Sequence, residues 1–326
     1  MSRDLARMLT SLRDYLGCGS ALTSITALST GHSNETYKLE GIDRILRMPP
    51  SKEGLLPPYD MAAQHAVLDA IGKHPAGPPV PKVYELCTDA AVIGDAFFIM
   101  ECLAGEAFEY ATPAWLKAAP PSMPEAMCAQ WIGAVAAVHQ LPVSAMPARH
   151  RSVVEEGQHW LNVARGAEAP AELIAVLEDL VAHPPRPSGP PCPIHGDPKH
   201  GNTLWNRAGR LLALLDWEMA GVSDPLLDLG YVIQFYDQGE AALGAAGYEL
   251  PGWWSRSRTI DEWQRMTGRT VIDLHRYEAL AVSKVAAIIA LGVHLYTTGR
   301  APDPRFAAWA DVVPPYVALA RRCAEG

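Results

Sequence analysis

The sequence predicts an α+β fold with two lobes: a small N-terminal lobe built on an antiparallel β-sheet with one helix, and a larger, mainly helical C-terminal lobe. Short β-rich segments fill residues 22–102, whereas helical periodicity dominates from about Pro124 onward. The change falls near residues 100–105, where a β-like run ends in ECLAG. We therefore divide the chain into lobes at 1–102 and 103–326.

The elements of the first lobe follow from their composition. The runs LTSITALST, ETYKLE, DRILRM, VPKVYELC and AFFIMECL are rich in the β-branched and aromatic residues that suit a half-buried sheet. Between the third and fourth runs, apolar spacing predicts a helix around Met61–Gly72. In the second lobe one segment interrupts the helices. This segment, PIHGDPKHGNTLWNRAGRLLALLDWEMAG at Pro193–Gly221, has the pattern of two short strands and a polar turn.

Charge, cysteine usage and hydropathy exclude several classes of protein. The net charge of −9 and the lack of a basic stripe argue against a nucleic-acid partner. The six cysteines are scattered without a C-x-x-C pair, which indicates free thiols in a reducing compartment. The N-terminus has no apolar signal-peptide block, and the most apolar run, residues 280–296, falls short of a bilayer span. We expect a cytoplasmic protein with no membrane partner.

The polar side chains within Pro193–Gly221 suit a divalent-cation site. Asp197 and Asn202 lie in the turn after an apolar strand, and Asp216 closes the second strand, so the ends of two short strands bring their oxygens to one cavity. Mg²⁺ takes one or two protein carboxylates or amides and completes its shell with phosphates and water. Asn202 and Asp216 supply that set, which leaves Asp197 free to accept a proton from an attacking hydroxyl. Lys199 lies two residues beyond, where its charge would offset that of a transferring phosphoryl group.

The spacing H-G-D-x-x-x-x-N, followed by L-L-D-W-E, resembles the catalytic and metal-binding motifs of the aminoglycoside phosphotransferase and choline kinase superfamily, whose fold is similar to that of protein kinases. The segments LSTGHSNETYKL, RILRMPP and YEALAVSKVAAIIALGVHLYTTG resemble a branch that includes the kinase-like domains fused to acyl-CoA dehydrogenases in some animals. The resemblance covers the chain from about Thr26 to Gly299. It implies a bilobal protein-kinase-like fold, with nucleotide bound by the first lobe and catalysis and acceptor binding in the second.

The resemblance also implies an activity and its cofactors: transfer of the γ-phosphoryl group of ATP or GTP, with Mg²⁺, to a hydroxyl of a small molecule. Asp197 is implied as the catalytic base, with Asn202 and Asp216 as Mg²⁺ ligands. The strand cation that grips the nucleotide phosphates matches Arg47. The sequence supports this independently, because strand alternation separates Arg47 from the competing cation Arg44, and a guanidinium suits phosphate oxygens.

The nucleotide-binding residues of the first lobe are assigned by the same resemblance. The turn Ser29–Asn34 would cover the phosphates, although it holds a single glycine and also reads as an ordinary hairpin turn. Backbone groups near five of its residues would form the anion-binding concavity: Ser29, Gly31, His32, Ser33 and Asn34. The segment Glu101–Leu103 would place the purine against backbone groups, without distinguishing ATP from GTP.

Several further residues carry expectations. Gln64 stands where the family has a Glu that pairs with the strand cation, so we expect Gln64 to hydrogen-bond Arg47 and Asp60 to supply the missing charge. Glu218 either meets a second Mg²⁺ through water or makes a structural hydrogen bond. The remaining expectations are an internal hydrogen-bonding role for His195, a surface position for His200, an N-cap at Asp224 and a structural anchor at Asp228.

The acceptor and one alternative function stay open. We expect the acceptor pocket to form around residues 153–165 and 248–269. An aminoglycoside would need acidic groups there, for which the candidates are Glu155, Glu156, Asp237, Glu240, Asp261 and Glu262. A hydroxyacyl-CoA type compound would suit a mixture of aromatic and basic side chains, which these segments supply as Trp160, Trp253, Trp254, Trp263, Arg256, Arg258 and Arg265. Alternatively, the tryptophans are core residues and the charges form a solvated rim. The alternative is a nucleotide-binding pseudokinase with a regulatory or scaffolding role, which Gln64 and the glycine-poor turn favour.

Overall fold

The computed structural model describes residues 3–28, 33–236, 238, 244–301 and 303–326. The N-terminal lobe is a five-stranded sheet in the order β1-β2-β3-β5-β4, in which every neighbouring pair is antiparallel. The strands are β1 (Ser24–Leu28), β2 (Glu35–Glu40), β3 (Arg44–Met48), β4 (Val83–Cys87) and β5 (Phe97–Glu101). The antiparallel sheet expected from the sequence is confirmed.

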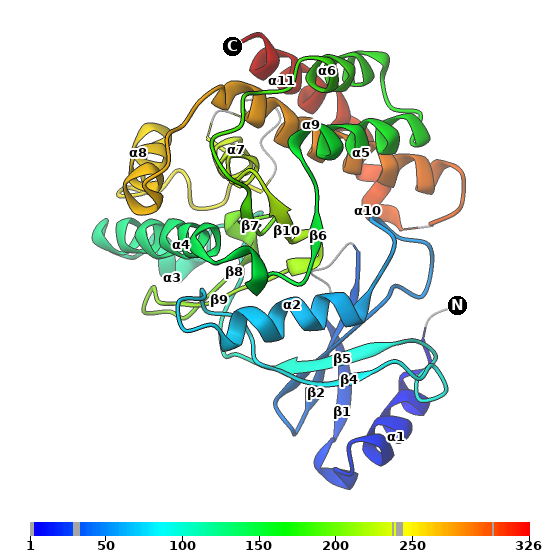
Figure 1. The fold of residues 1–326 in the computed structure, drawn as a ribbon. Helices are drawn as coiled ribbons and strands as arrows, with labels where there is room; N and C mark the ends of the chain where they lie inside the picture. Colours follow the sequence, from blue (N-terminus) through cyan, green and yellow to red (C-terminus); the bar gives the residue numbers. More distant parts are fainter. Residues whose placement is uncertain (1–2, 29–32, 237, 239–243, 302) are drawn as a thin grey trace.

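Two helices cover the two faces of this sheet, α1 (Leu5–Tyr15) and α2 (Met61–Lys73) (Figure 1). Alternation along β5 lets one strand serve both, because successive side chains point to opposite faces. Phe97 and Ile99 belong to the cluster that includes α1, whereas Phe98 belongs to the cluster that includes α2. Arg47 pairs in register with Phe98 and therefore lies on the α2 side of the sheet.

The C-terminal lobe is mainly helical, as predicted. Its helices are α3 (Ala114–Lys117), α4 (Ser122–Gln140), α5 (Val153–Gly166), α6 (Ala171–Ala182), α7 (Leu226–Ile233), α8 (Arg256–Thr267), α9 (Leu274–Thr297), α10 (Pro304–Ala307) and α11 (Val313–Glu325). Helix α5 begins with a capping box, in which the Ser152 hydroxyl accepts from the Glu155 N–H and the Glu155 carboxylate accepts from the Ser152 N–H. Glu155 is thereby engaged at the helix end.

The segment Pro193–Gly221 holds more strands than the two that the sequence predicts. Strand β7 (Cys192–Ile194) pairs with β10 (Gly221–Ser223), which also pairs with β6 (Arg149–His150). Strands β8 (Thr203–Trp205) and β9 (Leu211–Leu214) form a separate antiparallel ladder. Strands of two or three residues are too short for alternation to identify them, which explains why β8 was missed.

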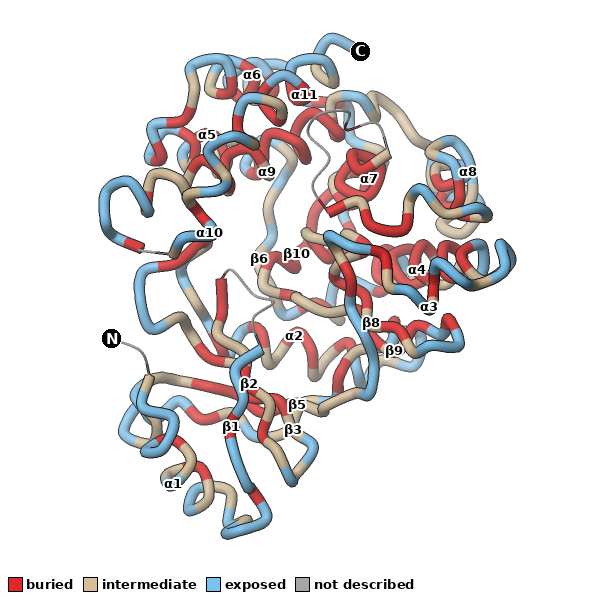
Figure 2. The backbone as a smooth tube through the Cα atoms, turned by 180° about the vertical axis from the view of Figure 1, so that it is seen from behind, coloured by how far each residue is buried: buried red, intermediate tan, exposed pale blue. Residues whose placement is uncertain are grey.

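Helix α9 is the longest in the described part of the chain, at 24 residues. By length and composition it is also the one described helix that could cross a membrane, so the expectation that its apolar run falls short of a span is wrong. However, 67% of its most apolar window is buried inside the protein. Figure 2 shows the buried stretch of α9 beside α5 and α7, where it acts as a central core helix.

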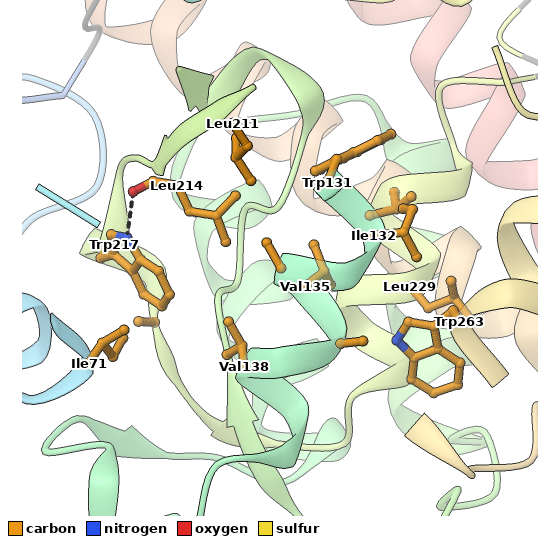
Figure 3. Close-up of a cluster of buried hydrophobic side chains, with 14 of the residues drawn as sticks. Ile71, Trp131, Ile132, Val135, Val138, Leu211, Leu214, Trp217, Leu229 and Trp263 are labelled. Carbon is orange, nitrogen blue, oxygen red and sulfur yellow. Dashed lines mark hydrogen bonds between the residues drawn. The ribbon is translucent and has the colours of Figure 1, made fainter. Parts of the chain in front are cut away.

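One hydrophobic cluster joins the two lobes. Ile71 of α2 belongs to the same cluster as Trp131 and Val135 of α4, and Figure 3 shows Ile71 beside Trp217. The Trp217 indole donates a hydrogen bond to the Leu214 carbonyl at 3.1 Å, which fixes its ring at the end of β9. Helix α2 is therefore docked on the segment that follows Asp216.

We predict that Ile71→Ala lowers the free energy of unfolding by about 2–4 kcal/mol, because Ile71 is fully buried and the truncation leaves a cavity between the lobes. Urea denaturation followed by tryptophan fluorescence measures the loss. Val143→Ala removes an apolar side chain that is 38% exposed and should change stability by no more than about 0.5 kcal/mol. Equal effects of the two substitutions would contradict a shared core at Ile71.

Candidate active site

The loop between β7 and β8 is fixed from behind by Asp228 of α7. The Asp228 carboxylate accepts hydrogen bonds from the backbone N–H groups of His195 at 2.7 Å and Gly196 at 2.8 Å. It also accepts from His139 Nε2 at 3.0 Å. Burial alone would raise the pKa of Asp228, but the His139 hydrogen bond and the loop amides outweigh burial and hold the pKa below its usual value. The expectation that Asp228 is a structural anchor is confirmed.

Asp224, by contrast, is only partly the cap that the sequence predicts. Its carboxylate accepts from the Leu226 N–H at 2.9 Å, within the first turn of α7. It accepts in addition from the backbone and the hydroxyl of Ser188, 36 residues earlier. Asp224 therefore joins two distant segments as well as capping the start of α7.

His195 is fully buried and connects the loop to the end of β9. Its Nε2 donates to the Leu215 carbonyl at 2.9 Å, and its Nδ1 accepts from the Asp197 N–H at 3.2 Å. Burial lowers the pKa of His195, so the ring is neutral in one defined tautomer. The expected internal hydrogen-bonding role is confirmed.

His200 is not the surface histidine that the sequence predicts. It is 1% exposed, lies within 6 Å of several aromatic rings, and neither ring nitrogen has a hydrogen-bond partner among the described residues. Burial lowers its pKa to about 3. One of the rings that enclose it, Trp205, is close in the chain, but the others come from distant segments and gave no local signal of its burial: Phe108, Trp131 and Trp253.

Asn202 holds one oxygen of Asp197 and leaves the other free. Asn202 Nδ2 donates to Asp197 Oδ2 and to the Asp197 carbonyl, both at 2.9 Å. Asp197 Oδ1 is buried but has no hydrogen-bond partner in the described part of the chain. Since the amide nitrogen of Asn202 faces Asp197, its Oδ1 points away and remains available as a ligand.

The β8–β9 ladder brings Asp216 next to Asn202, as the sequence predicts. Thr203 pairs with Leu214, and the Leu215 N–H donates to the Asn202 carbonyl at 2.8 Å. Asp216 has φ of 65°, in the left-handed region that non-glycine residues rarely adopt and that is common at functional sites. Its side chain is therefore directed by an unusual backbone conformation.

Arg47 of β3 reaches across from the N-terminal lobe to Asp216. Its guanidinium donates to Asp216 Oδ1, lies 3.6 Å from Glu218 Oε2, and donates through Nε to Gln64 Oε1 at 3.1 Å. Burial would raise the pKa of Asp216, but the charge and hydrogen bond of Arg47 outweigh burial and keep Asp216 ionised. The Gln64 contact is confirmed.

The expectation for Asp60 is wrong. Asp60 is the exposed N-cap of α2, where its Oδ1 accepts from the Ala63 N–H at 2.9 Å. A side chain at the helix N-cap is turned to the first-turn amides and not along the helix face. The negative charge that balances Arg47 comes from Asp216 of the other lobe, and Glu218 Oε2 lies 3.6 Å from the guanidinium.

The phosphate-covering turn is described only at its C-terminal end, since Ser29, Gly31 and His32 lie outside the described residues. The Ser33 hydroxyl donates to the Leu55 carbonyl at 3.1 Å. Asn34 Nδ2 donates to Glu218 Oε2, while Asn34 Oδ1 is buried without a partner among the described residues. Glu218 thus connects the end of the turn to Arg47, which accords with the hydrogen-bonding alternative expected for it.

Lys199 lies beside Asp197 and is paired with a residue that the sequence did not single out. Its ammonium donates to Glu109 Oε1 at 2.7 Å. Burial opposes protonation, but the charges of Asp197 and Glu109 outweigh burial and raise the pKa of Lys199. Glu109 belongs to an irregular segment after β5 and has no motif around it, so no sequence signal could have identified it.

The connection between the lobes leaves backbone donors unpaired among the described residues. The Glu101 N–H donates to the Lys82 carbonyl at 2.8 Å and the Cys102 N–H to the Asp43 carbonyl at 3.3 Å. The Leu103 N–H has no hydrogen-bond partner within the ranges that the structure describes. A purine edge could meet this group.

The tryptophans and arginines predicted to form the acceptor pocket, within 153–165 and 248–269, are core side chains or members of ion pairs. Trp160, Trp253, Trp254 and Trp263 are at most 9% exposed and belong to the core. The arginines of α8 are paired away from the loop, Arg256 with Glu278, Arg258 with Glu125 and Arg265 with Glu262. Asp237 and Glu240 lie outside the described residues. Tyr231 of α7 is a further side chain that the sequence missed. Burial, and then the nearby Asp197, raise the pKa of its hydroxyl.

The donor set at this site fits a small hard cation. No group of three or more His, Cys, Asp or Glu side chains that could hold a metal occurs among the described residues. An amide oxygen from Asn202 and an ionised carboxylate from Asp216 match an ion that takes few protein ligands and fills its shell with phosphate oxygens and water.

Comparison with known sequences assigns the family. The profile described as Phosphotransferase enzyme family matches residues 24–267, more than half of the chain. The chain belongs to the phosphotransferase enzyme family. It is also similar to acyl-CoA dehydrogenase family member 10 of Mus musculus, 29% identical over 62% of this chain and 19% of that protein. Member 11 of Gallus gallus is 28% identical over 65% of this chain and 28% of that protein, so the chain spans less than a third of either relative.

Solved structures of this phosphotransferase family have the same kinase-like fold, which confirms the predicted fold class. A Ralstonia eutropha protein assigned as an aminoglycoside phosphotransferase matches with a TM-score of 0.78, 21% identity and 99% coverage of both chains. Macrolide 2′-phosphotransferase type I matches with a TM-score of 0.63 and 17% identity over 96% of this chain and 99% of that chain. Aminoglycoside 2′-phosphotransferase-IIIa, solved as its GDP complex, has a TM-score of 0.61 and 14% identity, with 99% of each chain covered.

A pH dependence of stability follows from Glu218. Burial, and then the charge of Asp216, raise the pKa of Glu218 from 4.5 to about 8. The folded state therefore binds a proton that the unfolded state releases between these values, so this stabilisation is complete below pH 4.5 and is lost as the pH rises toward 8. In the metal-free protein, the free energy of unfolding should therefore fall with rising pH by up to about 1.4 kcal/mol per pH unit. We predict that Glu218→Gln removes this fall.

Urea titrations at pH 5, 6, 7 and 8 measure this decline in the parent and in Glu218→Gln. Glu178→Gln, which alters an exposed carboxylate paired with Arg165, serves as the control and should follow the parent. Parallel pH profiles for the parent and Glu218→Gln would show that Glu218 is ionised in the folded protein.

Proposed function

We propose that this protein is an ATP- or GTP-dependent, Mg²⁺-dependent O-phosphotransferase that transfers the γ-phosphoryl group to a hydroxyl of a small molecule. The observation that carries the proposal is the Asp197 carboxylate beside Lys199: Asn202 holds its Oδ2, and its buried Oδ1 has no hydrogen-bond partner among the described residues. A carboxylate oxygen without a partner, next to a cation and two metal-type donors, is what an attacking hydroxyl needs.

Each residue of the site has one role in this proposal. Asp197 Oδ1 accepts the proton of the acceptor hydroxyl, and Asn202 keeps the carboxylate oriented through Oδ2. Lys199 offsets the charge of the transferring group, with Glu109 holding its ammonium in place. Asn202 Oδ1 and Asp216 would hold Mg²⁺, which supplies charge neutralisation at the phosphate oxygens.

The N-terminal lobe, residues 1–102, is proposed to bind the nucleotide. Arg47 offers a planar fork for the α- and β-phosphates, and Gln64 fixes its Nε end without neutralising it. The turn Ser29–Asn34 would cover the phosphates through its backbone groups, and Glu101–Leu103 would meet the purine. Structural neighbours support nucleotide and divalent-ion binding, since one is a GDP complex and the amicoumacin kinase contains AMP-PNP and Ca²⁺.

The acceptor would bind in the C-terminal lobe, residues 103–326. A structural neighbour was solved with GDP and kanamycin, which keeps an aminoglycoside among the candidates. Among the described residues, two acidic side chains near Asp197 are already paired, Glu109 with Lys199 and Glu156 with Arg151. Because a polycation needs free carboxylates when it is desolvated, the pairing favours a hydroxyacyl-CoA type acceptor over an aminoglycoside. We expect this reaction to occur in the cytoplasm.

A catalytically silent nucleotide-binding protein remains the second candidate, because Gln64 replaces a charged partner of Arg47. The structure weakens this reason, since Asp216 supplies the charge that Gln64 lacks. Thermal-shift titration with ATP, with and without Mg²⁺, followed by an ATP-consumption assay across hydroxylated metabolites, aminoglycosides and hydroxyacyl-CoAs, separates the two. Mg²⁺-dependent stabilisation without consumption in any arm would favour the silent protein.

We predict that Asp197→Asn lowers kcat for phosphoryl transfer by about 10²–10⁴-fold while nucleotide affinity changes little, because the substitution removes the proton acceptor and keeps the shape. Steady-state ADP release with the acceptor found by the screen measures kcat. Asp69→Asn alters an exposed carboxylate on α2 and should retain the parent rate. Unchanged turnover of Asp197→Asn would sink the assignment of the base.

We predict that Arg47→Met raises the KM for Mg·ATP by at least about tenfold, since the charge-assisted contact to the phosphates is lost. Initial rates at varied ATP measure the change. Arg44 lies on the opposite face, 4.0 Å from the Tyr84 ring centroid, and Arg44→Met is the matched control with a KM expected near that of the parent. A larger effect from Arg44→Met would show that the wrong strand cation was chosen.

A further inference from the structure

Lys284 is a buried cation behind the catalytic loop that none of the roles above uses. It lies on α9, is 6% exposed, and its ammonium donates a hydrogen bond to the Gly196 carbonyl. The same ammonium lies 4.9 Å from the ring centroid of Tyr231 and 5.3 Å from that of Trp160. Its contacts therefore converge on the residue that precedes Asp197 and on an aromatic ring of α7.

The burial of this lysine is costly and needs compensation. Burial lowers the pKa of Lys284, and the charges of Glu156 and Asp197 offset this only in part. Glu156 is itself occupied by Arg151 at 3.2 Å and by the Trp160 indole at 2.8 Å. The one hydrogen bond of Lys284 in the described structure is to the Gly196 carbonyl, so the lysine stabilises the position of that backbone group.

Gly196 is held on both of its polar backbone groups. Its N–H donates to Asp228 at 2.8 Å, and its carbonyl accepts from Lys284. It has φ of 84°, and a Cβ at this position would lie 2.3 Å from the Met219 carbonyl oxygen, so the position admits only glycine. The conformation of the residue before Asp197 thus depends on one carboxylate and one ammonium from two different helices.

Tyr231 lies near both the Lys284 ammonium and Asp197. Its side chain is 6% exposed, and the nearby Asp197 contributes, after burial, to the raised pKa of its hydroxyl. A cavity of about 20 Å³, with room for a single water, is lined by Lys284, Gly196 and Tyr231 among others. If the ammonium is removed, the loop and the ring therefore have space to shift.

We propose that Lys284 is a positioning residue for phosphoryl transfer: its ammonium fixes the Gly196 carbonyl and the Tyr231 ring, and so aims the Asp197 carboxylate at the acceptor hydroxyl. This inference rests on the proposed function. The contacts of Lys284 among the described residues are to Gly196, Trp160 and Tyr231, none of which is assigned to the nucleotide or the metal, so we expect its loss to affect the chemical step and not nucleotide binding.

The test compares Lys284→Met, Lys284→Arg and the control Ser283→Ala. Ser283 is the preceding residue of α9, fully buried, with a hydroxyl that has no hydrogen-bond partner among the described residues. Lys284→Met should lower kcat by about 100-fold with the KM for Mg·ATP within about threefold of the parent, as expected for a misplaced base. Lys284→Arg should recover part of kcat because it restores the cation, and Ser283→Ala should match the parent.

A double variant tests whether Lys284 and Tyr231 act together. Tyr231→Leu removes the ring that the Lys284 ammonium contacts and should lower kcat, and Lys284→Met combined with Tyr231→Leu should lower kcat no further than the worse single variant. Multiplicative effects, or a kcat of Lys284→Met within about threefold of the parent, would overturn the proposal.

Hydrogen exchange separates the failure of this inference from that of the proposed function. In Lys284→Met, amides of the peptide containing His195 and Gly196 should exchange at least about tenfold faster than in Ser283→Ala, with the N-terminal sheet unchanged. This measurement needs no acceptor, so it tests the contact between Lys284 and Gly196 even if the parent transfers no phosphoryl group. Unchanged exchange in that peptide would overturn the proposal whatever the activity.

Discussion

The ion pair between Arg47 and Asp216 is the interaction on which the arrangement of this site depends. It joins the α2 face of the N-terminal sheet to the end of β9 in the other lobe, and both side chains are largely buried. A buried charge that loses its partner is strongly destabilising, so each member holds the other in the cleft. Gln64 and Glu218 complete the cluster by contacting Arg47 from α2 and from the segment after Asp216.

The hydrophobic contacts support the same alignment. Ile71 of α2 packs in one cluster with Trp217, one residue beyond Asp216, so the helix that carries Gln64 is docked on the strand end that carries the carboxylate. On the far side of the loop, Asp228 of α7 and Lys284 of α9 hold the backbone of Gly196. The polar site thus lies between the apolar contact of Ile71 with Trp217 and the charged contacts of Asp228 and Lys284 with Gly196.

The sequence predicted those parts of the site that local spacing determines. The five-residue step from Asp197 to Asn202 and the strand ending at Asp216 identified the three oxygen-bearing groups, and strand alternation distinguished Arg47 from Arg44. Glu109 and Lys284 could not be found in this way, because their partners are 90 and 88 residues away in the chain. His200 was misplaced for the same reason, since three of the four rings that bury it come from distant segments: Phe108, Trp131 and Trp253.

Asn202, directly before β8, and Asp216, shortly after β9, are proposed to hold one divalent ion together with the nucleotide. Mn²⁺ binding followed by electron paramagnetic resonance in the presence of AMP-PNP tests this most directly. The parent should bind a single Mn²⁺ per chain, and Asp216→Asn and Asn202→Ala should each weaken that binding by at least about tenfold, as expected when a metal ligand is lost. Mn²⁺ affinity equal to that of the parent in both variants would contradict the account.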